Sequence, residues 1–267
     1  MKIKIEQLQP NPYRNIDAYP VEEEKVKALM ASIEQTGFWD NILARQYNGE
    51  IQIAYGHHRL EALKRLKDPE FEVDIPVKEL DEATMLKIMA NENMEHWATT
   101  PSVTDETVRA TRQFLIDHPE ETEKMGFRGS TETPGKRVIA KFLGTSWNEA
   151  KVGFSLERLK WIEEDKVDKE VIYMFTTDGS ARTFIEALKD EEKSGTPIPK
   201  EKQKSIAELY IKSGNKKQAL KAAIDEEILV EPDMEEPKDE LIKKFQSEAI
   251  QIIEGIDWLD EAITKLQ

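Results

Sequence analysis

The fold is decided by residues 53–66, which read Ile-Ala-Tyr-Gly-His-His-Arg-Leu-Glu-Ala-Leu-Lys-Arg-Leu. Apolar and polar residues alternate up to Tyr55, as they do in a strand, and the leucines that follow recur every third residue, as in a helix. Gly56 between them permits a tight turn that residues with a Cβ resist. The sequence therefore predicts a strand, a turn and a helix that begins directly after Gly56.

The start of this helix is a candidate anion-binding site. The first backbone N–H groups of a helix have no partner inside it, and the helix dipole makes this end positive. Arg59 adds a permanent charge and can hold two phosphate oxygens at once. Together these features favour a phosphate. An ordinary strand–turn–helix with exposed polar residues stays open, because a lone glycine turn is a weak motif.

The spacing of Gly56, Arg59 and Ala62 resembles the core of the ParB/sulfiredoxin superfamily. Partition proteins read Gly-Glu-Arg-Arg-x-x-Ala here and sulfiredoxins read Gly-Cys-His-Arg, so this chain, with His58, has a form between the two. The chain contains no cysteine, which excludes the thiol chemistry of sulfiredoxin. The resemblance implies an α+β ParB/sulfiredoxin-like N-terminal domain, followed by an all-α helix-turn-helix domain and a helical C-terminal segment.

Other segments also resemble the ParB domain. Residues 9–14, a Pro- and Asn-rich turn, are similar to the Asn-Pro-x-x-x-Arg segment near its start. Thr36 and Gly37 match the beginning of Thr-Gly-x-x-Gln-Pro, which cups the nucleotide base in the family, whereas Asp40 and Asn41 replace its Gln-Pro. The identity of the base is therefore left open.

Residues 92–96 resemble Glu-Asn-x-Gln-Arg, in which the family's Glu and Asn serve Mg²⁺ and the triphosphate. Glu92 and Asn93 match, and His96 stands in place of Arg. One or two oxygen ligands from protein suffice for Mg²⁺, because phosphates supply others. The resemblance implies that CTP, or ATP, binds with Mg²⁺, the metal being held by Glu92 and Asn93. The implied nucleotide contacts are Thr36, Gly37, Gly56, His57, His58, Arg59 and Asn93.

Charge is unevenly distributed along the chain. The formal net charge of −15 argues against a general nucleic-acid binder, because phosphates repel such a protein. Residues 124–160 nevertheless contain eight Lys and Arg residues against three Glu residues. A basic segment in an acidic protein indicates a localised nucleic-acid contact, with chance clustering on a solvated surface as the alternative.

This basic segment contains a candidate helix-turn-helix. Residues 137–143 predict a short apolar helix that ends at Gly144, and Ser146 can cap a second helix. The stretch resembles Leu-Ala-x-x-Leu-Gly-x-Ser of ParB, which precedes the recognition helix; a generic helical hairpin is the alternative. The candidate contacts to double-stranded DNA are Arg137, Lys141, Ser146, Trp147, Asn148, Lys151 and Arg158.

Three parts are expected: a ParB-like nucleotide-binding domain at 1–98, a helix-turn-helix DNA-binding domain at 99–190, and a helical segment at 191–267. Apolar and small residues between 245 and 266 follow a heptad pattern, which predicts either a homodimer contact or packing within one protomer. The chain has no cysteine, no apolar run long enough to span a membrane, and no signal-like apolar core at its N-terminus. These three absences predict a cytoplasmic protein with no membrane contact.

Three functions are compatible with these patterns. The first is a ParB-like, nucleotide-linked DNA-binding protein that acts in plasmid, chromosome or phage DNA partition or regulation, with weak NTPase activity left open. The second is a nuclease or ATP-dependent enzyme of the same superfamily, with Glu92 as the catalytic metal ligand and His57 or His58 as acid or base. The third is a transcriptional regulator whose nucleotide site is vestigial.

Overall fold

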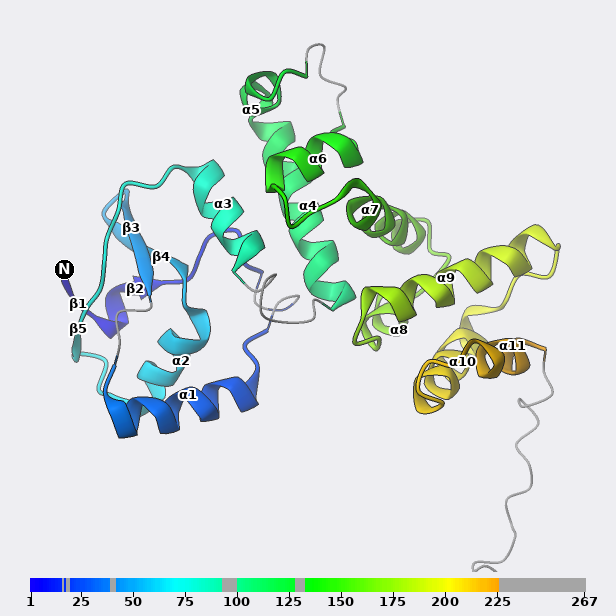
Figure 1. Cartoon of the computed structure of the whole chain (residues 1–267), viewed down its shortest axis with the longest axis horizontal. Coiled ribbons are helices and arrows are strands. Elements are labelled where there is room, and N and C mark those ends of the chain that lie inside the picture. Colours follow the sequence, from blue (N-terminus) through cyan, green and yellow to red (C-terminus); the bar gives the residue numbers. More distant parts are fainter. Residues whose placement is uncertain (16, 18–19, 39–41, 93–99, 128–132, 226–267) are drawn as a thin grey trace, which may run out of the picture.

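The computed structural model describes residues 1–15, 17, 20–38, 42–92, 100–127 and 133–225 of the 267-residue chain. These residues run from a small N-terminal α/β part, through helices grouped around α4, to a second group of helices that ends at α11 (Figure 1). The expectations for Asp40, Asn41, Asn93, His96 and the heptad pattern lie outside the described residues.

The N-terminal part alternates short strands with helices. Its strands are β1 (Lys2–Lys4), β2 (Leu8–Gln9), β3 (Leu43–Tyr47), β4 (Glu50–Tyr55) and β5 (Glu72–Asp74). Its helices are the 3₁₀ turn η1 (Ile5–Gln7), α1 (Glu23–Thr36), α2 (His57–Leu66) and α3 (Glu82–Asn91). This order agrees with the predicted α+β domain.

Strand β4 is the centre of a three-stranded sheet. It pairs in parallel with β2 and antiparallel with β3, while β1 and β5 form a separate antiparallel pair. Asn48 and Gly49, which join β3 to β4, both have positive φ, of 49° and 84°, as a tight hairpin turn requires. Ile51 and Ile53 of β4 are buried in the core that lies under α2.

The predicted strand–turn–helix is confirmed. Gly56 follows β4 directly and adopts a left-handed conformation with φ 99°, which favours glycine because a Cβ is strained there. Helix α2 begins at the next residue and buries Leu60 and Leu63 against the sheet.

The rest of the described chain is helical. The helices are α4 (Pro101–Asp117), α5 (Pro119–Lys124), α6 (Lys136–Leu143), α7 (Glu149–Glu163), α8 (Lys169–Tyr173), α9 (Asp178–Lys193), α10 (Lys200–Lys212) and α11 (Lys217–Ile224). Side-chain caps fix three of their starts, with Thr100, Asn148 and Thr177 accepting backbone N–H bonds. No described helix combines the length and apolar character needed to span a membrane.

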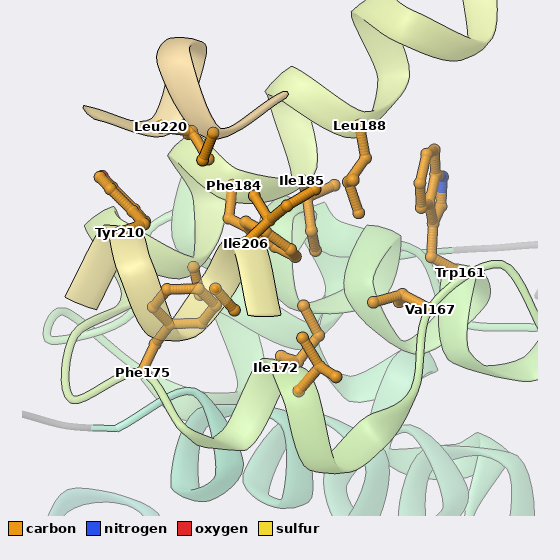
Figure 2. Packing of buried hydrophobic residues seen from close by; sticks show 14 residues of the cluster. Trp161, Val167, Ile172, Phe175, Phe184, Ile185, Leu188, Ile206, Tyr210 and Leu220 are labelled. Atoms are coloured by element: carbon orange, nitrogen blue, oxygen red, sulfur yellow. The ribbon is translucent and has the colours of Figure 1, made fainter. Parts of the chain in front are cut away.

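The hydrophobic cores do not follow the boundaries expected at residues 98 and 190. One core joins α3, which belongs to the N-terminal part, to α4, α6 and α7. A second core, shown in Figure 2, runs from Trp161 at the end of α7 to Ala223 in α11 and includes Phe184 and Tyr210. Residue 190 lies inside α9, whose apolar face belongs to this second core. Helices α10 and α11 therefore pack onto α8 and α9.

Candidate functional site

The end of α1 and the start of α2 line an open cavity of about 280 Å³. Thr36 and Gly37 reach it from the end of α1, and Arg59 reaches it from the first turn of α2. The two helices lie side by side in Figure 1, which explains how residues more than twenty positions apart share one cavity. Three of the residues expected to contact a nucleotide are thus brought together.

The walls of this cavity suit a ligand with one apolar and one anionic part. Leu29, Ile33 and Phe38 provide apolar surface, and the Arg59 guanidinium provides charge and several donors. Gly37 has φ 82° and donates its N–H to Ile33 O at 2.9 Å, which turns the chain sharply at the end of α1. An aromatic base beside a phosphate has this combination of properties.

A second cluster lies at the N-terminus of α2. The N–H of Gly56 donates to Oε1 of Glu92 at 2.8 Å, and Oε2 of Glu92 lies 3.3 Å from Nδ1 of His57 and 3.7 Å from Nη1 of Arg14. Burial opposes ionisation of Glu92, but the bonds from His57 and Gly56 and the charge of Arg14 outweigh it, so the pKa of this carboxyl is lowered. The helix end expected to bind an anion does so, with a carboxylate of the chain itself.

His57 and His58 are placed as structural residues. The N–H of Asn11 donates to Nε2 of His57 at 3.1 Å, and the N–H of Glu22 donates to Nε2 of His58 at 3.2 Å. Both rings therefore accept at Nε2 and carry their proton at Nδ1. Burial lowers the pKa of each, so both are neutral at pH 7.

This arrangement gives His57 and His58 a structural role beside the nucleotide contacts that the resemblance implies for them. The two residues are 5% and 9% exposed, and each ring holds the N-terminal loop onto α2. The same bonds argue against either ring as a catalytic acid or base. Within the described residues, no three His, Asp or Glu side chains converge as a metal site.

Asn11 and Arg14 are site residues that sequence reasoning left without a role. The Asn11 amide donates to Ala54 O and Met85 O, both at 3.1 Å, and so ties the loop to β4 and α3. Arg14 is 5% exposed and lies against Glu92. The signal was the Asn-Pro-x-x-x-Arg resemblance, which pointed to this loop without placing it beside α2.

The segment expected to form a helix-turn-helix contains the two helices α6 and α7. Gly144, with φ 99°, ends α6, and the Asn148 side chain accepts the N–H of Lys151 at 2.8 Å to cap α7. The cap is therefore Asn148, two residues later than the Ser146 expected from the sequence. Arg137, Lys141, Ser146 and Asn148 are exposed, and Lys151 is half-buried with its Nζ 4.9 Å from the centre of the Trp147 ring.

Two expected DNA contacts are buried instead. Trp147 is 3% exposed and belongs to the core of α3, α4, α6 and α7. Arg158 is 1% exposed, with Nη2 at 2.6 Å from Asp105 Oδ1 and 2.8 Å from Asp178 Oδ1. Ser155 also donates to Asp105, at 2.7 Å. These two side chains hold α7 in place from within and are not available to a DNA surface.

Comparisons with known proteins agree with the N-terminal fold. Residues 1–94 match the family model of the ParB N-terminal domain. A structure of a Pnob8-like ParB-N domain has a TM-score of 0.54 at 12% sequence identity, over 91% of this chain and 96% of that one. Residues 1–94 are therefore similar in sequence to the ParB N-terminal domain, and the chain shares the fold of that ParB-N structure. This similarity agrees with the motifs around Gly56.

Two other solved structures match with lower TM-scores. They are C-terminally truncated ParB from Caulobacter crescentus, complexed in one case to the centromeric parS site and in the other with CTP-gamma-S. Their identities are 20% and 21%, their TM-scores 0.38 and 0.31, and they cover 83% and 84% of this chain and 97% and 98% of those chains. No curated protein sequence matches this chain.

Proposed function

We propose that this protein binds a nucleoside triphosphate, with CTP implied by its family, in the cavity between α1 and α2, and binds double-stranded DNA through α6 and α7. The observation that carries the proposal is the meeting of Thr36, Gly37 and Arg59 at one cavity of about 280 Å³. These residues come from two separate motifs of the resemblance. The family resemblance implies that the protein acts in the partition or regulation of plasmid, chromosome or phage DNA.

Different residues would contact different parts of the nucleotide. The base would lie against the end of α1, at Thr36 and Gly37, and Arg59 would hold a phosphate. Mg²⁺ would neutralise phosphate charge, held by Glu92 together with Asn93, and the carboxylate oxygens of Glu92 are ligands of the type that this ion takes. The buried rings of His57 and His58 would keep the loop in place around the phosphates.

The proposed DNA-binding surface consists of two exposed cations on α6 and an exposed asparagine at the start of α7. Arg137 and Lys141 are exposed on α6, and Asn148 is exposed at the start of α7. The cations would contact phosphates, and the Asn148 amide would reach a base edge from the N-terminal end of the second helix. The acidic remainder of the chain would keep this contact local.

Filter binding with labelled CTP and ATP, with and without DNA, tests the nucleotide site. Arg59→Ala is expected to weaken binding by about tenfold or more, because it removes a charged hydrogen-bond donor to phosphate. Lys64→Ala is the matched control, since Lys64 is an exposed cation on the same helix that does not line the cavity. Failure of the wild type to bind either nucleotide contradicts the proposal.

Salt-dependent binding to duplex DNA tests the second site. Arg137→Ala and Lys141→Ala are each expected to lower the affinity and to reduce the slope of log K against log salt concentration by about one. Lys64→Ala again serves as the control and should leave the slope unchanged. Binding that persists with the same slope in the double variant places the DNA elsewhere. Binding that ignores nucleotide favours a regulator with a vestigial site.

A further inference from the structure

The Glu92 carboxylate lies at the N-terminus of α2, the helix that also carries Arg59. Its Oε1 accepts the Gly56 N–H at 2.8 Å, and its Oε2 lies within 3.7 Å of both the His57 ring and the Arg14 guanidinium. The side chain is 12% exposed. A helix N-terminus, a ring N–H donor and an arginine together form an anion-binding seat, which we call the Gly56 seat. Here it holds an anion of the chain itself.

We propose that Glu92 is an internal competitor for the Gly56 seat, so that a nucleotide phosphate binds there only when this carboxylate leaves. The inference rests on the proposed nucleotide binding. A carboxylate and a phosphate cannot share the seat, because the Gly56 N–H is a single donor and two anions at this separation repel each other.

The position of Glu92 connects the seat to the helical part. Glu92 caps the end of α3, and the neighbouring Asn91 donates its side-chain amide to Leu143 O of α6 at 3.1 Å. Movement of Glu92 therefore acts on its neighbour Asn91, which makes the contact between α3 and α6. When a phosphate fills the Gly56 seat, the hydrogen bond from Asn91 to the end of α6 is therefore altered, and α6 leads directly into the turn before α7.

Nucleotide affinity without metal measures the competition. The full chain is titrated calorimetrically with CTP, ATP and inorganic triphosphate in the presence of EDTA, as wild type, Glu92→Gln and Glu61→Gln. Glu92→Gln removes the charge while keeping the size of the side chain, and is expected to bind about tenfold more tightly, which corresponds to about 1.4 kcal/mol. Glu61→Gln is the control, because Glu61 lies on α2 and pairs with Arg65 at 2.8 Å, away from the seat.

The outcomes separate this inference from the proposed function. Tighter binding by Glu92→Gln, with Glu61→Gln within about twofold of wild type, supports the competition. Equal or weaker binding by folded Glu92→Gln, while the wild type binds, overturns it and leaves the proposed function standing. No binding by the wild type or any variant in EDTA overturns the inference, and the same titration repeated with Mg²⁺ then decides the proposed function separately: no binding there overturns it as well. If Glu92→Gln does not fold, Glu92→Asp replaces it, and its shorter side chain is expected to give a smaller gain; no gain overturns the inference.

Discussion

Arg158 is the charged residue that holds α7 to its neighbours from inside the protein. Its guanidinium bonds to Asp105 of α4 through both Nε and Nη2, and Nη2 also lies beside Asp178 at the start of α9. Forming a buried ion pair costs desolvation, so the pair itself adds little to the free energy of unfolding. Removing one partner lowers that free energy strongly, because the other charge stays buried without compensation.

Replacement of Arg158 tests this structural role. Arg158→Met leaves Asp105 buried without its cation and is expected to lower the free energy of unfolding by about 3–5 kcal/mol. Lys160→Met, on the same helix but exposed, is expected to change it by less than about 0.5 kcal/mol. Urea unfolding of both variants gives the comparison, and equal small effects would show that Arg158 is a surface cation after all.

Asp105 gives the helical part a pH dependence. Burial raises the pKa of the Asp105 carboxyl to about 6, although Arg158 and Ser155 counteract it. The ordinary pKa of Asp is about 3.9, so the folded state binds this proton more tightly than the unfolded state. The contribution of Asp105 to stability is therefore full below about pH 4 and is lost as the pH rises to about 6.

An NMR titration of the Asp105 side-chain carboxyl measures this pKa directly. The expected midpoint is about 6. The pKa should be lower in a variant that exposes this carboxyl to water, because burial is what raises it. Asp105→Asn should remove the corresponding part of the pH dependence of unfolding between about pH 4 and 6. A midpoint below 4 in the wild type would contradict the assigned environment.

At the scale of elements, the turn between α6 and α7 depends on one glycine. Gly144 has φ 99°, and a Cβ built there meets no atom within 4 Å, so its requirement is backbone conformation and not space. The turn fixes the angle at which α7 leaves α6, and hence where Asn148 is displayed.

Two alanine substitutions of opposite expected sign test this turn. Gly144→Ala is expected to destabilise the protein by about 1–2 kcal/mol, because alanine is strained at positive φ. Gly179→Ala, in the first turn of α9 with open space around it, is expected to stabilise by about 0.5–1 kcal/mol. Thermal unfolding of the two variants provides the measurement, and a neutral Gly144→Ala would show that the turn tolerates a Cβ.

At the scale of the whole molecule, local patterns predicted the elements but not which side chains they bury. The alternation before Tyr55 and the turn at Asn48 and Gly49 gave the central hairpin, since both are local signals. The family resemblance implied that His57 and His58 contact the nucleotide. Their backbone partners come from a loop some forty residues away, which no local pattern reveals.

Arg158 was misassigned although a signal was present. The buried residues of α7 are Val152, Ser155, Arg158 and Trp161, which recur every third residue and so share one helix face. The basic composition of residues 124–160 hid this periodicity, because the net charge of a segment says nothing of which cation points inward. The meeting of Arg59 with Thr36 depended on the packing of α1 on α2, and the family resemblance anticipated it.

The central claim is that the cavity between α1 and α2 is a nucleotide site, and a structure of the full chain with CTP, ATP and Mg²⁺ tests it most directly. The account predicts a nucleotide whose base lies against Thr36 and Gly37 and whose phosphates contact Arg59. A nucleotide bound elsewhere, or a cavity still empty beside Arg59 at saturating nucleotide, contradicts it.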